Sequence, residues 1–234
     1  MTGTAALAYA AIMEVVRARL QGALPESLRA DAAVVIDVLR ATSTAAVLLG
    51  RGVARLWIAT VDEARELSPQ SHLLVSERVA GGIDNSPSLA ASLALDARLP
   101  VLVTTNGTRA LAAAERHAPL VLAASFLNLG ATVEHLAAAA PGRVLLVPAG
   151  DFDTGERHLE DELCADALAA ALAGRPLELA PLFARVRREP RVQRRLEEEP
   201  ILAGDLDLSL TGDRYPVAMR FFRDAEGRGW LART

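Results

Sequence analysis

Lysine is missing from this sequence: all 25 basic side chains among its 234 residues are arginines. The chain therefore has no lysine to form a Schiff base or to complete a P-loop. Any phosphate or carboxylate that it binds must be held by arginine guanidinium groups, by backbone N–H groups or by a metal ion. The absence of lysine thus narrows the search for anion contacts to a short set of arginines.

Other scarcities limit the class of protein. The single cysteine, Cys164, excludes a disulfide framework and a multi-thiolate zinc site, and we expect it to be a packed helix residue. A net charge of −4 argues against nucleic-acid binding, which needs a basic stripe. No apolar run reaches the ~18 residues of a membrane span. Residues 5–13 are apolar without a preceding positive charge, and Glu14 and Arg17 continue them as an amphipathic helix rather than a signal peptide. We therefore expect a cytoplasmic protein with no nucleic-acid or membrane partner.

Short apolar runs alternate along the chain with alanine-rich segments of helical character. The expected strands are residues 33–36, 55–58, 73–75, 101–104, 120–123 and 144–147. The expected helices are residues 43–49, 62–67, 87–95, 108–116, 127–139 and 158–173. Each strand run is continuously apolar, as in strands covered on both faces. The alternation predicts a three-layer α/β/α fold with a mostly parallel sheet.

The length fits one domain, residues 1–234, with its core at about 30–173. Residues 175–200 are rich in arginine and glutamate, and we interpret them as a solvated surface with short helices near 182–188 and 191–198. The tail, residues 201–234, is expected to pack back on the core.

Polar residues gather after the expected strands, and the carboxyl ends of parallel strands are where α/β sheets bind ligands. The candidates at these strand ends are Asp37, Arg40, Thr42, Ser43, Thr44, Arg78, Asn85, Ser86, Thr105, Asn106, Gly107, Thr108, Arg109, Ser125, Asn128, Glu160 and Asp161. The opposite strand ends carry far fewer polar residues, so the pattern predicts one functional rim. Of the four histidines, only His158 is placed to reach it.

Purely structural explanations also exist for these residues. Hydroxyl residues at 42–44 are good helix N-caps, Asp37 with Arg40 can be a structural ion pair, and acidic residues at 160–161 favour a helix N-terminus. Two short matches are discounted. The Asp-Thr-Gly triplet at 153–155 belongs in aspartic proteases to a β-barrel-like context, and the D-x-D at 151–153 follows the wrong strand for a haloacid-dehalogenase phosphatase. We expect that segment to be a solvated loop.

Six motifs, taken together and in order, point to a known family. They occupy residues 35–44, 85–87, 104–111, 125–128, 149–150 and 159–165. In these segments the chain resembles the 2-phosphosulfolactate phosphatase family, the ComB-like proteins. The resemblance implies a Mg²⁺-dependent phosphatase that acts on 2-phospho-3-sulfolactate on the route to coenzyme M. Residues 77–87 depart from the family pattern, with Ile83 in place of an aromatic, so phosphatase action on a different 2-phospho-acid is the main alternative.

Roles can be assigned to the candidates on this hypothesis. Asp37, Glu160 and Asp161 would bind Mg²⁺, with Glu77 in reserve, because Mg²⁺ takes hard oxygen ligands. Arg40 and Arg109 would clamp the phosphoryl group, and N–H groups near 42–44 and 106–108, including that of Asn106, would complete its cradle. Arg78 could take the substrate's carboxylate or sulfonate. Asp37 could instead be a covalent nucleophile. A non-catalytic phosphate-ester-binding protein is the rival from another class, and a homodimer is plausible.

Overall fold

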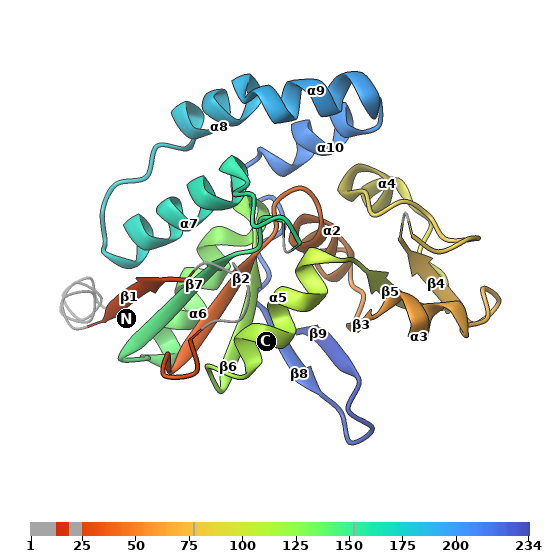
Figure 1. The fold of residues 1–234 in the computed structure, drawn as a ribbon, viewed down its shortest axis with the longest axis horizontal. Coiled ribbons are helices and arrows are strands. Elements are labelled where there is room, and N and C mark those ends of the chain that lie inside the picture. Colours follow the sequence, from red (N-terminus) through yellow and green to blue (C-terminus); the bar gives the residue numbers. More distant parts are fainter. Residues whose placement is uncertain (1–12, 19–24, 77, 152) are drawn as a thin grey trace.

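The computed structural model describes residues 13–18, 25–76, 78–151 and 153–234. Within them, nine strands form one sheet in the order β1-β7-β2-β6-β8-β9-β3-β5-β4, which Figure 1 shows from β1 on the left to β4 on the right. All six strands expected from the sequence are present. They are β2 (Ala32–Ile36), β3 (Arg55–Ala59), β4 (His72–Val75), β5 (Leu99–Val103), β6 (Leu120–Ala124) and β7 (Arg143–Pro148). The prediction of an α/β fold with a mostly parallel sheet is confirmed.

The helices follow the strands as expected, with small shifts at their ends. They are α2 (Ala41–Gly50), α3 (Val61–Arg65), α4 (Pro87–Ser92), α5 (Asn106–Glu115), the short 3-10 helix η1 (Phe126–Asn128), α6 (Leu129–Ala139) and α7 (Leu159–Leu172). The charged segment forms α8 (Leu179–Arg188) and α9 (Pro190–Glu198), and α10 (Leu202–Ser209) follows. In Figure 1, α8 and α9 lie together above α7 and α10.

Alternate residues of the central strands face two different helical layers. In β2, Ala33 and Val35 pack in a core with residues of α2 and α5. Val34 and Ile36, on the other face of the same strand, pack in a core with residues of α6 and α7 and with apolar residues of α8, α9 and α10. This alternation is the period of a strand that is buried on both faces, and it gives the three layers predicted from the sequence.

The sheet consists of two parallel groups joined by an antiparallel hairpin. Strands β1, β7, β2 and β6 pair in parallel, as do β3, β5 and β4. Between them lie β8 (Met219–Arg223) and β9 (Gly229–Arg233), and the pairings β6–β8, β8–β9 and β9–β3 are all antiparallel. Three reversals in succession mean that the two parallel groups run in opposite directions.

A flat sheet of this topology would point the carboxyl ends of the two groups to opposite edges. Five strand-to-strand steps separate β2 from β5. At roughly 20–25° of twist per step, the sheet turns by about 100–125° between them. This turn brings the segment after β5 toward the segment after β2, and the two do meet: a Cβ at Gly107 would lie 2.9 Å from the Cβ of Ala41. The single rim predicted for one parallel sheet is thus a junction between two groups.

Both ends of the described chain differ from expectation. Glu14–Arg17 is strand β1, paired with β7, and not the continuation of an amphipathic helix; residues 5–12 lie outside the described residues. Pairing with β7 satisfies one side of the backbone of this short segment, which lies at the edge of the sheet. The tail does more than pack back, because β8 and β9 fill the middle of the sheet. No helix in the part of the chain that the structure describes is long and apolar enough to cross a membrane.

Removal of the indole of Trp230 tests whether the β8–β9 hairpin contributes to the core. This side chain is 1% exposed, stacks on Trp57 with ring centroids 6.0 Å apart, and donates a hydrogen bond from Nε1 to Asp224 at 2.8 Å. We expect Trp230→Ala to lower the free energy of unfolding by about 3–5 kcal/mol in urea titrations, because a large buried ring is lost. Arg233→Ala, at an exposed position of the same strand, should change it by less than about 0.5 kcal/mol. Equal effects would show that the hairpin does not contribute to the core.

Candidate active site

A polar cleft of about 510 Å³ opens where the segments after β2, β4, β5 and β7 meet α9 and its C-terminal end. It is lined by Asp37, Leu39, Arg40, Arg78, Asp84, Asn85, Thr104, Thr105, Asn106, Asp151, Glu156, His158, Arg191, Arg195 and Glu199. Six of the sequence-predicted site residues are in this lining: Asp37, Arg40, Arg78, Asn85, Thr105 and Asn106. The described lining has four guanidinium groups and five carboxylates, so it is built for charged ligands.

Asp37 occupies the turn from β2 into α2 and is 8% exposed. Its Oδ1 accepts a hydrogen bond from the N–H of Ala41 at 3.2 Å, and its backbone carbonyl accepts one from the Thr42 hydroxyl at 2.7 Å. Asp37 therefore accepts hydrogen bonds from donors in the N-terminal turn of α2, as a carboxylate at a helix N-terminus does. This moves the expected phosphate cradle away from residues 42–44.

The N-terminus of α5 lies directly against Asp37. A Cβ at Gly107 would stand 3.1 Å from Oδ2 of Asp37, so the glycine is needed here for close packing of the two loops rather than for approach of a ligand. Thr104 Oγ1 accepts a hydrogen bond from the N–H of Thr108 at 3.2 Å, and no cap comes from the side chain of Thr105. Thr105 and Asn106 line the cleft at this helix N-terminus, where N–H groups and the helix dipole favour an anion.

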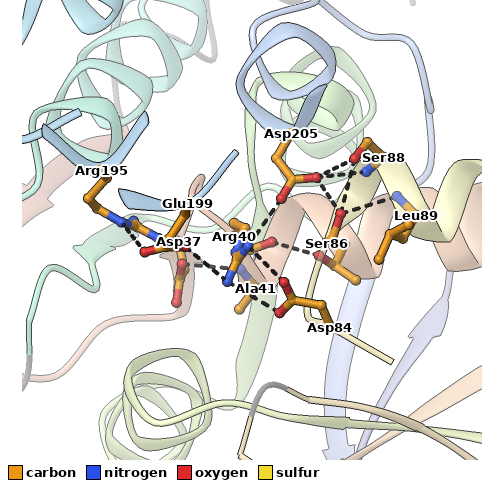
Figure 2. A network of polar contacts seen from close by, with 11 residues as sticks. Asp37, Arg40, Ala41, Asp84, Ser86, Ser88, Leu89, Arg195, Glu199 and Asp205 are labelled. Carbon is orange, nitrogen blue, oxygen red and sulfur yellow. Dashed lines mark hydrogen bonds and ion pairs between the residues drawn. The ribbon is translucent and has the colours of Figure 1, made fainter. Parts of the chain in front are cut away.

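Arg40 pairs with three carboxylates, and its side chain is only 7% exposed. Figure 2 shows its guanidinium surrounded by carboxylates from three segments. Nη1 lies 3.2 Å from Asp205 and 3.4 Å from Asp84, and Nη2 lies 3.8 Å from Glu199. The pairing offsets the desolvation of a buried charge. Arg40 is thus both a member of structural ion pairs, with Asp205, Asp84 and Glu199, and a cation of the cleft wall.

The proposed metal ligands Glu160 and Asp161 are placed differently from the prediction. Both oxygens of the fully buried Glu160 accept hydrogen bonds from Nη2 of Arg191, at 2.5 and 2.7 Å. Asp161 accepts from the N–H groups of Val38 at 2.7 Å and Gly150 at 3.1 Å. Neither side chain lines the cleft, and the described residues contain no group of three acidic, histidine or cysteine side chains that could hold a metal ion. Of the three expected ligands, only Asp37 lines the cleft in the part of the chain that the structure describes.

Burial and neighbouring charges shift the pKa values of several ionisable groups in and around the cleft. Burial, and then the Arg191 charge, lowers the pKa of His158, so its imidazole is neutral at pH 7. Burial raises the pKa of Asp161 well above its usual value, and the neighbouring Glu160 and Asp37 add to this. The hydrogen bonds from Arg195 lower the pKa of Glu199. His158 reaches the cleft, as its position in the sequence suggested.

Most of the hydroxyl and amide side chains that we predicted to contact the ligand are buried in the protein interior. Thr42, Ser43, Thr44, Ser86, Ser125 and Asn128 are all 0–2% exposed and absent from the cleft lining. Ser86 and Ser125 are N-caps, and the Asn128 amide donates to the carbonyls of Ala123 at 3.2 Å and Val217 at 3.0 Å. All of them except Ser43, whose buried hydroxyl has no hydrogen-bond partner among the described residues, satisfy backbone groups. The side chain of Thr108 also lies outside the lining, as does Gly107, so any contact of these two residues with a ligand would come from their backbone and stays a prediction.

Arg109 is the one predicted phosphate-clamping arginine that does not reach the cleft lining. Its side chain is 47% exposed and pairs with Asp153 at 2.5 Å, in the loop that the sequence suggested was solvated. Asp151 in the same loop does line the cleft. Glu77, the reserve metal ligand, lies outside the described residues.

The charged segment supplies site residues that the sequence interpretation missed. Arg191, Arg195 and Glu199 line the cleft, and Arg191 is 9% exposed, so this segment is not only a solvated surface. Their spacing of four residues, which puts them on one helical face, was the available signal. Asp84 and Glu156 were also missed. The expectation for Cys164 is confirmed: it is fully buried, and burial raises the pKa of its thiol.

The buried pair Arg191–Glu160 ties α9 to α7 and can be tested by stability. We expect Arg191→Met to lower the free energy of unfolding by about 3–5 kcal/mol, because the buried Glu160 carboxylate loses its partner. Glu160→Gln combined with Arg191→Met should cost less than Arg191→Met alone. Arg187→Met, which breaks the exposed pair with Asp207, should cost about 1 kcal/mol or less. Denaturant titrations measure all three, and a double variant no more stable than the single one would contradict this account.

Comparison with known proteins places the chain in a family. The sequence model described as 2-phosphosulpholactate phosphatase matches residues 20–187. Proteins named probable 2-phosphosulfolactate phosphatase are similar to the chain in Synechococcus sp. strain CC9605 (38% identity over 68% of this chain and 66% of the relative) and in Deinococcus radiodurans (39% over 64% and 65%). A third, from Thermotoga maritima, is 38% identical over 60% of this chain and 62% of its own. The matches span just under two thirds of the length of these relatives. The chain belongs to the 2-phosphosulfolactate phosphatase family.

Proposed function

We propose that this protein is a phosphatase that hydrolyses the phosphate monoester of a 2-hydroxy acid, with 2-phospho-3-sulfolactate as the leading substrate. The observation that carries the proposal is the meeting of Asp37, Arg40 and the N-terminus of α5 in one polar cleft. Family membership and the names of the relatives support it. The products would be 3-sulfolactate and inorganic phosphate.

The charges of the cleft suit a substrate with several anionic groups. Arg40 and the N–H groups at the start of α5 would bind the phosphoryl oxygens, because both lie beside Asp37. Arg78, Arg191 and Arg195 are the other guanidinium groups of the described lining. They would hold the carboxylate and sulfonate of 2-phospho-3-sulfolactate. The clamp role that the sequence suggested for Arg109 is not part of this proposal.

A magnesium ion fits the donor chemistry of the cleft. Five carboxylates line it, outnumbering the four guanidinium groups in the described part of the chain, and hard oxygen donors are what Mg²⁺ binds. One or two carboxylates suffice when phosphate oxygens and water complete the shell. Asp37 is the carboxylate we assign, in place of the three-ligand set. When bound, the ion would neutralise charge on the phosphoryl group.

Asp37 has two chemically distinct roles open to it. As a magnesium ligand it would orient the phosphoryl group, and water would attack the phosphorus. As a nucleophile its carboxylate would form an aspartyl-phosphate while the ester P–O bond breaks, and water would then hydrolyse that intermediate. In both roles the hydrogen bond from Ala41 holds the carboxylate in place. Acid-quench trapping of labelled phosphate on the protein separates the two roles.

The proposal keeps several wider expectations of the sequence as predictions. These are a cytoplasmic location, a homodimeric assembly, a small phosphorylated anion as the sole class of partner, and a place in coenzyme M synthesis.

A substrate screen tests the function directly. Phosphate release should be measured for 2-phospho-3-sulfolactate, 2-phospholactate and 2-phosphoglycerate, each with Mg²⁺ and with EDTA. We expect the sulfonated ester to have the highest kcat/KM and EDTA to abolish turnover. Faster turnover of a different 2-phospho-acid would reassign the substrate. Binding of these esters without turnover under any condition would make the protein a phosphate-ester-binding protein and overturn the proposal.

Loss of the Asp37 charge should abolish Mg²⁺-dependent phosphate release. Asp37→Asn keeps an oxygen that can accept from Ala41, so circular dichroism and the unfolding midpoint should remain close to those of the wild type. We expect kcat/KM to fall at least about a thousandfold, since both candidate roles need the carboxylate. Asp62→Asn, on α3 with a side chain 91% exposed, is the control and should keep full activity. Near-wild-type turnover by Asp37→Asn would remove Asp37 from the mechanism.

A further inference from the structure

The carboxylate of Asp205 holds Arg40 from the side away from the cleft. Asp205 lies in α10 and is fully buried, and its Oδ2 accepts a hydrogen bond from Nη1 of Arg40 at 3.2 Å. It is absent from the described cleft lining, whereas Asp84 and Glu199, the other acidic neighbours of Arg40, both line the cleft. An anion that enters the cleft can compete with those two carboxylates for the guanidinium, but it does not reach Asp205.

Asp205 is itself held rigidly by α4. Its Oδ1 accepts hydrogen bonds from the N–H of Ser88 at 3.1 Å, from the Ser88 hydroxyl at 2.6 Å and from the Ser86 hydroxyl. Figure 2 shows this arrangement, with Ser86 and Ser88 on one side of Asp205 and Arg40 on the other. A carboxylate with both oxygens occupied by fixed donors has one orientation available, so it fixes the position of the guanidinium that it binds.

The two ends of the Arg40 guanidinium fork have different neighbours. Nη1 donates to Asp205 at 3.2 Å and also lies 3.4 Å from Asp84, whereas Nη2 lies near two cleft-lining carboxylates, 3.4 Å from Asp84 and 3.8 Å from Glu199. A long, flexible side chain loses substantial rotamer entropy when it is held in one place. An anchor that is present before the substrate binds removes that cost from the binding step, which is how preorganised sites gain affinity.

We propose that Asp205 is a positioning residue that presents Arg40 to the phosphoryl group of the substrate. This inference rests on the proposed function, in which Arg40 binds phosphoryl oxygens. Asp205 lies beyond residues 20–187, the segment that the family model matches, so the family match assigns it no role. The C-terminal part of the chain would thereby contribute to the reaction through Arg40.

Asp205→Asn tests the proposal, with Asp207→Asn as its matched control. Asp207 lies one half-turn further along α10, and its side chain is 71% exposed and pairs with Arg187. For each variant, kcat and KM for phosphate release are measured together with the folded fraction in denaturant. We expect Asp205→Asn to reduce kcat/KM at least tenfold per folded molecule, mainly through KM, and Asp207→Asn to stay within twofold. In an Arg40→Gln background, Asp205→Asn should cause no further loss of kcat/KM, because it acts through Arg40.

Two further measurements keep the test decisive. If Asp205→Asn does not fold, Ser88→Ala, which removes one donor to Asp205 without changing charge, should raise KM by two- to fivefold. If the wild type turns over none of the esters, the proposed function fails. The affinity for inorganic phosphate, measured by titration calorimetry, then decides the inference. Asp205→Asn should weaken that affinity at least fivefold, and Asp207→Asn should not. Three results would overturn the inference. The first is a wild-type KM and phosphate affinity in Asp205→Asn. The second is a loss of kcat/KM in Asp205→Asn that multiplies with the loss in Arg40→Gln, and the third is a loss that unfolding fully explains.

Discussion

The burial of one guanidinium group organises this molecule. The side chain of Arg40 is 7% exposed, and a buried charge is tolerated only when opposite charges and hydrogen bonds replace the lost water. The replacements come from the segment after β4, from the end of α9 and from α10. Arg40 can therefore be buried only when these three distant parts of the chain converge. The same convergence makes the wall of the cleft, so folding and site formation depend on one interaction.

The C-terminal third of the chain has a larger role than its charged composition suggests. Its hairpin, β8 and β9, fills the gap between two parallel groups of strands that run in opposite directions. Its helices carry Arg191 onto the buried Glu160 and Asp205 onto Arg40. A second tether comes from Asp161, which joins the N–H groups of Val38 and Gly150 across the ends of β2 and β7. Acidic residues that looked like metal ligands thus hold together the loops on which the cleft is built.

The repeating core was readily predicted from the sequence, whereas the ends of the chain were not. Continuous apolar runs identified β2 to β7, because strands covered on both faces have no polar positions. Strand β1 is only four residues long, and Glu14 and Arg17 at its ends match the polar positions of a helix equally well. In β8, Arg220 and Arg223 interrupt the apolar pattern, and an insertion into the middle of the sheet leaves no local trace in the sequence. The direction of the second strand group follows from that insertion, so it too could not be foreseen.

For the site, the sequence located the loops but not the direction of the side chains. Asp37, Arg40 and Asn106 reach the cleft, while Ser43, Ser125 and Asn128 are buried behind it. A hydroxyl that caps a helix and one that binds a ligand occupy the same positions after a strand, so composition cannot separate them. Among the arginines of the charged segment, burial of Arg191 depends on Glu160, 31 residues earlier, and this is a tertiary contact.

The central claim is that Arg40, anchored by carboxylates from the C-terminal segments, forms the phosphoryl site beside Asp37 and the N-terminus of α5. A crystal structure with bound orthovanadate and Mg²⁺ tests it most directly, because vanadate occupies the place of the transferred phosphoryl group. The account predicts vanadate oxygens within hydrogen-bond distance of the Arg40 guanidinium and of N–H groups at the start of α5, with Asp205 still bound to Nη1. Vanadate bound away from Arg40, for example at the exposed Arg109, would contradict it.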